Sequence, residues 1–168
     1  MRENELNRDD NPPVGRKVLT LVRLKAGQAM TCRIVSVNLW GLWTHWTGSA
    51  SEPCFRDDKK CDGCKKGFPA RWKAWLHVVN VENRRQVFLE LTSTCASILL
   101  DQAPDRKNLR GLRVTFTRSK GADNGRLRCE LLDASVNGLT LPDPLDPLDT
   151  LKTLWRVPQE LDRLQVVA

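Results

Sequence analysis

The sequence of 168 residues contains no tyrosine, only two histidines and no run of about 18 apolar residues. Without such a run, no segment is expected to cross a membrane, and the polar first residues lack the apolar stretch of a secretory signal. We therefore expect a cytoplasmic protein, in which cysteine thiols stay reduced. The six cysteines then need an explanation other than disulfides.

Catalytic motifs are also missing. No phosphate-binding glycine loop, serine–histidine–aspartate set or carboxylate cluster occurs. The two histidines, His45 and His77, leave little material for histidine-based acid–base chemistry. The sequence therefore predicts a protein that is not an enzyme.

Positive charge is concentrated in the middle of the chain. The whole chain has a net charge of +7, but residues 16–134 carry 22 basic and 11 acidic side chains, a net charge of +11. A basic domain attracts polyanions, of which nucleic acid is the most abundant in a cytosol. An ordinary solvated basic surface would have the same total, so charge alone leaves both interpretations open.

Prolines divide the chain into four parts. Residues 1–15 are polar and end in Asn-Pro-Pro, as expected for a disordered arm, and residues 16–134 form one domain. Residues 135–147 contain three prolines and predict an extended linker. Residues 148–168 predict an amphipathic helical tail, which would dock on its own domain or, as we slightly favour, on a protein partner. Its apolar stripe consists of Leu148, Leu151, Leu154 and Trp155.

Alternating apolar residues make the central domain mainly β. The expected strands are 30–46, with a bend at Gly41, then 72–81, 86–92, 112–117 and 126–133, and a helix is expected at 93–103, capped by Ser93 or Thr94. This β-β-β-α-β-β order is that of the OB-fold, a five-stranded barrel that often binds single-stranded nucleic acid. The cysteine-rich loop 47–70 would be inserted between strands 1 and 2. A generic α+β domain has the same order, and residues 16–27 leave room for one more strand.

The cysteine-rich region predicts a structural zinc site. The spacing is His45-x8-Cys54-x6-Cys61-x2-Cys64, which supplies the four N and S ligands of a tetrahedral zinc ion and leaves no open position for catalysis. Gly63 would make the tight turn between the last two ligands easy. The alternatives are a redox Cys-x-x-Cys pair or unrelated free thiols. The remaining cysteines, Cys32, Cys95 and Cys129, are expected to be ordinary buried thiols.

Tryptophans and basic residues predict a nucleic-acid surface. Aromatic rings stack on bases while cations hold phosphates, and alternation along 72–81 places Trp75 outward beside Lys73. The bend at Gly41 leaves the faces of Trp40, Trp43 and Trp46 undetermined. The candidate nucleic-acid-binding residues are Trp43, Trp46, Arg71, Lys73, Trp75, Arg113, Arg118, Lys120, Arg126 and Arg128.

The ligand order His45, Cys54, Cys61, Cys64, ending in Cys-x-x-Cys within a basic β domain, resembles that of the zinc-containing OB-fold single-stranded DNA-binding proteins typified by the helix-destabilising protein of T-even phages. The resemblance implies that zinc orders a subdomain beside a DNA cleft. We expect a single-stranded nucleic-acid-binding protein, with DNA favoured, acting in replication, repair or recombination. The alternatives are a zinc-stabilised adaptor and an accessory subunit of a nuclease or mobile-element complex, and the sequence does not separate DNA from RNA.

Overall fold

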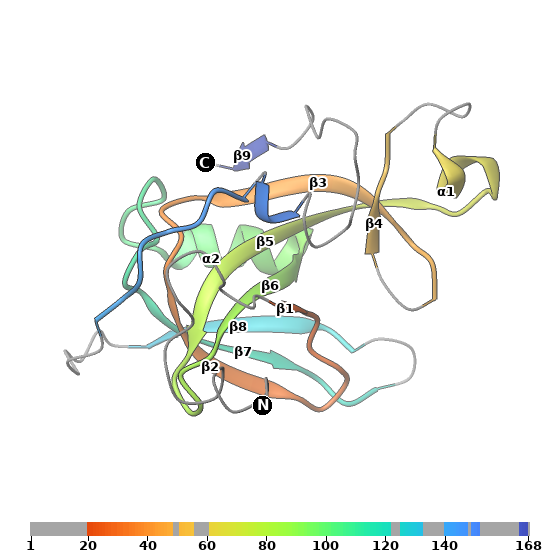
Figure 1. Cartoon of the computed structure of the whole chain (residues 1–168). Helices are drawn as coiled ribbons and strands as arrows, with labels where there is room; N and C mark the ends of the chain where they lie inside the picture. Colours follow the sequence, from red (N-terminus) through yellow and green to blue (C-terminus); the bar gives the residue numbers. More distant parts are fainter. Residues whose placement is uncertain are drawn as a thin grey trace, which may run out of the picture.

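The computed structural model describes residues 20–48, 51–55, 61–121, 125–132, 140–147, 149–151 and 165–167. The predicted arm at 1–15 and most of the predicted tail lie outside these residues, as does part of the linker. The described chain is mainly β, as predicted (Figure 1). Its elements are β1 (Thr20–Val22), β2 (Ala29–Ile34), β3 (Leu39–Trp46), β4 (Ser51–Pro53), α1 (Asp62–Lys65), β5 (Ala70–Asn80), β6 (Gln86–Thr92), α2 (Ser93–Gln102), β7 (Arg113–Arg118), β8 (Leu127–Leu132) and β9 (Gln165–Val167).

One twisted sheet joins the strands in the order β1-β6-β5-β2-β7-β8, and β3 pairs with β5, β4 and β9. The predicted hairpin is confirmed as β5 and β6, whose register pairs Leu76 with Leu89. The predicted helix is confirmed as α2, although its N-cap is Thr92, whose hydroxyl accepts a hydrogen bond from Cys95 N. Figure 1 shows β4 and α1 at one end of the molecule, where β3 and β5 extend beyond the other strands.

The prediction of a single strand at 30–46 is wrong, because the strand is interrupted between β2 and β3. The backbone N–H groups of Val35 and Ser36 both donate to the carbonyl oxygen of His77, at 2.8 and 3.2 Å. Two residues facing one is the pattern of a β-bulge, which turns a strand. Gly41 is not at this turn. A side chain there would collide with the indole of Trp72, so the glycine is required for that ring to lie across β3.

The predicted closed five-stranded barrel is also wrong for the described residues. Closure would require the edge of β6 to pair with β8, but β1 occupies that edge in parallel pairing, with Leu21 opposite Phe88. Helix α2 packs against β5, β6 and β8 instead. The sheet is therefore curved and open.

Strand β5 is buried on both faces, which overturns the outward placement of Trp75. Leu76 and Val78 face the main core beneath α2, together with Leu89 and Leu99. On the other face, Trp75 is 0% exposed in a second cluster with three other buried side chains. That cluster consists of Leu42, Trp75, Phe88 and Leu151. Alternation identified the correct face, but that face is itself covered.

The C-terminal segment supplies the cover. Leu151 is 0% exposed in the second cluster, and Gln165–Val167 adds β9 to the edge of β3. Residues 165–167 form a strand where a helix was predicted, and Leu151 packs within its own chain, while docking of the tail on a protein partner stays a prediction. No helix in the described ranges is long and apolar enough to cross a membrane.

Candidate functional site

Four metal-ligating side chains meet where β4 and α1 lie against the end of β3. Cross-strand partners share a face, and His45 pairs with Glu52. Cys54 is two residues beyond Glu52 and therefore lies on the same face as His45, held there by its N–H, which donates to Trp43 O at 2.8 Å. Cys61 immediately precedes α1 and Cys64 lies in its single turn, so a spacing of three places both on one side.

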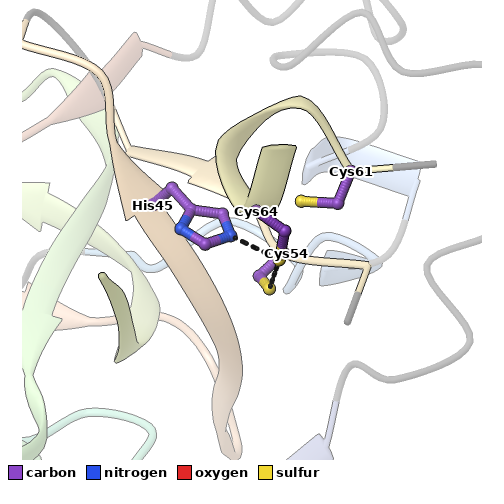
Figure 2. Close-up of side chains that lie close together, drawn as sticks. All are labelled: His45, Cys54, Cys61 and Cys64. Atoms are coloured by element: carbon purple, nitrogen blue, oxygen red, sulfur yellow. Dashed lines mark hydrogen bonds between the residues drawn. The ribbon is translucent and has the colours of Figure 1, made fainter. Parts of the chain in front are cut away.

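The four ligand atoms all lie within 4.8 Å of one another (Figure 2). Cys64 Sγ is 3.4 Å from His45 Nε2 and 3.7 Å from Cys54 Sγ. His45, Cys54 and Cys61 are buried, with exposures of 2%, 3% and 2%. The donor set is one imidazole nitrogen and three sulfurs, so the cluster could hold a metal ion.

Gly63 acts by leaving space for a side chain of another element. Its φ is not positive, so the turn does not need the wider range of backbone angles that glycine allows. A Cβ at position 63 would instead collide with the imidazole of His45. The turn of α1 thus rests directly on the ring, which brings Cys64 to Nε2.

Two thiols of the cluster, those of Cys61 and Cys64, have shifted pKa values. Burial raises the pKa of Cys61, but the N–H groups of Cys64, Phe55 and Gly63, together with the Cys64 side chain, outweigh it and lower that pKa to about 7. Burial and then the neighbouring sulfurs of Cys54 and Cys61 raise the pKa of Cys64 to about 12. Sulfurs this close cannot easily all be ionised without a cation between them.

The other cysteines lie apart from this cluster. Cys32 and Cys95 are 0% exposed and Cys129 is 8% exposed, all within the main core. Burial raises the pKa of Cys32 to about 12, as expected for a thiol that packs as a small apolar side chain. His77 is buried and its Nε2 lies 2.9 Å from Gln86 Oε1, away from the ligands.

A second feature is a cavity of about 910 Å³, called here the basic cleft. Six cationic side chains from separate parts of the chain line it: Arg23, Arg71, Lys73, Arg118, Arg126 and Arg128. Its other walls include Thr92 and Thr94 at the start of α2 and residues 125–129 of the β7–β8 hairpin. Glu90 is buried, and its Oε1 lies 3.7 Å from Nζ of the lining residue Lys73.

Trp46 extends the basic cleft toward the metal cluster. A smaller cavity of about 190 Å³ shares Arg23, Arg71 and Lys73 with the basic cleft and is also lined by Trp46. Trp46 is 41% exposed, and the guanidinium carbon of Arg23 lies 4.0 Å from the centroid of its ring. Because Trp46 follows His45 directly, the metal cluster and the aromatic wall are built from the same strand end.

The structure gathers only some of the predicted nucleic-acid residues. Arg71, Lys73, Arg118, Arg126 and Arg128 line the basic cleft, and Trp46 lines its extension. Four others do not line either cavity. Trp43 is 39% exposed elsewhere on β3, Trp75 is buried, Arg113 is at the opposite end of β7 from Arg118, and Lys120 lies over Gly27.

Sequence reasoning missed that Arg23, Thr92 and Thr94 line the basic cleft. Arg23 follows β1, and the parallel pairing of β1 with β6 carries it toward Glu90. The segment at 16–27 was recognised only as a strand candidate, and no local pattern indicates a long-range parallel partner. Thr92 is both the last residue of β6 and the N-cap of α2. Its place at the junction of a predicted strand and a predicted helix is the signal that could have identified it.

No family model matches the chain, and the searches of curated proteins and of solved structures find no match either. The functional conclusion therefore depends on the geometry of these two sites.

Proposed function

We propose that this chain is a single-stranded nucleic-acid-binding protein, with DNA favoured, in which one zinc ion has a structural role. The observation that carries the proposal is the convergence of six cationic side chains on one cavity of about 910 Å³. Burial lowers the pKa of Arg118, and the nearby charge of Arg23 lowers it further. Cations that repel one another in this way are stabilised by a bound polyanion.

The residues that line the two cavities favour single-stranded over double-stranded nucleic acid. A base in a single strand is free to stack on the half-exposed ring of Trp46, while phosphates reach Arg126 and Arg128, which are exposed on the hairpin. In a duplex the base faces are already stacked, so the aromatic wall would contribute little.

The strand arrangement supports the same function. Across the sheet of an OB-fold, the strands lie in the order third, second, first, fourth and fifth. Here β6, β5, β2, β7 and β8 lie side by side in that same order. The basic cleft lies between the start of β5 and the β7–β8 hairpin. In an OB-fold these positions flank the two loops that contact nucleic acid. The open sheet described above would be a variant of that fold in which β1 replaces barrel closure.

Zinc is the metal that the donor set favours. Tetrahedral zinc has bonds of about 2.3 Å to sulfur and about 2.0 Å to nitrogen, so sulfurs are roughly 3.8 Å apart and sulfur and nitrogen roughly 3.5 Å apart. The observed distances from Cys64 Sγ are 3.7 Å to Cys54 Sγ and 3.4 Å to His45 Nε2. Three thiolates and an imidazole also match the soft ligands that zinc takes in structural sites.

Salt-dependent binding to labelled oligonucleotides tests the nucleic-acid function. The protein should bind dT and rU single strands more tightly than a duplex of equal length, with log affinity falling linearly as log salt rises because bound cations are released. The ratio of dT to rU affinity separates DNA from RNA. Equal affinity for duplex and single strand, or binding that does not respond to salt, would contradict the proposal.

Metal content tests the zinc site independently. Protein purified from zinc-containing medium should carry about one zinc per chain, and Cys61→Ser should lose most of it. Cys129→Ala is the matched control, because that thiol lies outside the cluster and its loss should leave the zinc content unchanged. Reduced protein without metal would refute the site while leaving the basic cleft in place.

A further inference from the structure

Lys73 has a position that no other described lysine shares. Its side chain is 15% exposed and lines both the basic cleft and the smaller cavity beside Trp46. Its Nζ is 3.7 Å from Oε1 of Glu90, whose side chain is 3% exposed. The other lysines in the described residues are all exposed: Lys25, Lys65, Lys66, Lys107 and Lys120.

The surroundings of Lys73 favour a neutral amine more than those of a surface lysine do. Burial lowers its pKa, Glu90 raises it, and the positive charges of Arg23, Arg118 and Arg71 lower it again, with a net shift downward. Glu90 Oε1 accepts no hydrogen bond, although it is buried. Its ion pair with Lys73 Nζ places it as the proton acceptor for the ammonium.

We propose that Lys73 captures abasic sites in the bound strand by forming a reversible imine with the aldehyde of the baseless sugar. The inference rests on the proposed function, because the strand must first occupy the basic cleft. An abasic site suits this position, since the sugar carries no base to fill the cavity while phosphates on both sides remain for the arginines. A buried amine flanked by cations is the usual form of an imine-forming lysine.

The step balances without any further reagent. The Lys73 ammonium transfers one proton to Glu90, and the Nζ lone pair then attacks the C1′ carbonyl carbon. A carbon–nitrogen bond forms, the carbonyl oxygen leaves as water with one proton from Nζ and the proton held by Glu90, and a protonated C=N double bond remains. Addition of water reverses the reaction, so each chain holds one abasic site at a time.

Reductive trapping provides the test. The intact protein is mixed at saturating concentration with a labelled single-stranded oligonucleotide containing one abasic site, and cyanoborohydride reduces any imine to a stable amine. We expect one covalent adduct per chain, and peptide mapping by mass spectrometry should place it on Lys73 of the unaltered protein. Lys73→Arg should reduce the adduct at least tenfold, whereas Lys107→Arg, an equal change on the exposed loop after α2, should not.

Some outcomes would overturn the inference without touching the proposed function. Normal binding of an intact dT strand with no adduct, or with an adduct mapped to exposed lysines, means that Lys73 is not a reacting amine. Failure to bind intact strands together with failure to trap would remove both proposals. An adduct on Lys73 without measurable equilibrium binding would show that the amine reacts but would overturn capture by way of a strand bound in the basic cleft.

The role of Glu90 is tested by a pH profile. The charged groups facing Lys73 are Glu90 on β6, Arg71 on β5, Arg118 on β7 and Arg23 after β1. Because Glu90 raises the pKa of Lys73, Glu90→Gln should lower it, so half-maximal trapping should move to lower pH. An unchanged profile would show that Glu90 does not act on the amine, which would overturn that part of the inference.

Discussion

Gly63 lies directly against the imidazole ring of His45, so that any side chain at position 63 would collide with ring atoms. Gly63→Ala should therefore push the turn of α1 away from the ring, separate Cys64 from Nε2 and lower zinc affinity by roughly 10- to 100-fold. A colorimetric chelator competition measures this. Gly121→Ala is the control, because a Cβ there meets no atom within 4 Å. Equal zinc affinity in the two variants would show that α1 adapts.

Charge reversal at the hairpin should weaken nucleic-acid binding selectively. Arg126 is exposed and lines the basic cleft, so Arg126→Glu should reduce dT affinity by roughly tenfold at low salt and lower the salt slope by about 0.7 per lost phosphate contact. Lys107→Glu makes the same change of charge on the loop after α2, which does not line the cleft. Anisotropy titrations at several salt concentrations compare the two. Equal losses of dT affinity in the two variants would mean that binding depends on the net charge of the protein and not on the basic cleft.

Two tryptophans of β3 with similar exposure should behave differently. Trp46 is 41% exposed and lines the smaller cavity, whereas Trp43 is 39% exposed and lines neither cavity. Trp46→Leu should cost about 1–3 kcal/mol of dT binding, the contribution of one stacked base, and Trp43→Leu should cost little. Melting temperatures check that both variants stay folded. A larger loss of binding in the Trp43 variant would show that bases stack on Trp43 and not on Trp46.

The second cluster should be a source of stability rather than of binding. Trp75 is fully buried against Leu42, Phe88 and Leu151, so Trp75→Ala should lower the free energy of unfolding by about 3–5 kcal/mol. Urea denaturation measures the change, and oligonucleotide affinity of the folded fraction should be retained.

Leu151 tests whether the C-terminal segment belongs to the fold. It is 0% exposed, so Leu151→Ala should lower the free energy of unfolding by about 2–5 kcal/mol. Leu145→Ala, at a half-buried position earlier in the same segment, should cost less. If deletion of residues 140–168 left the melting temperature unchanged, the contact of Leu151 with Trp75 would contribute nothing to the fold.

The amino-acid sequence determined the elements that depend on local periodicity and short-range spacing. Alternation predicts the strands at 72–81 and 86–92 and the helix at 93–103, close to β5, β6 and α2, although the cap is Thr92 and not the predicted Ser93 or Thr94. The four candidate ligands were also readable, because His45, Cys54, Cys61 and Cys64 have a spacing that few other sites require. These features are encoded within about 20 residues of chain.

Only the tertiary structure decided which surfaces are covered and which residues meet across the sheet. Alternation puts Trp75 and Lys73 on one face of β5, but Leu151 covers the tryptophan end while the lysine end opens into the basic cleft. Arg23 reaches that cleft because β1 pairs in parallel with β6, a contact between residues more than sixty positions apart. Such pairings depend on the free energy of the whole packed chain, so local sequence patterns do not reveal them.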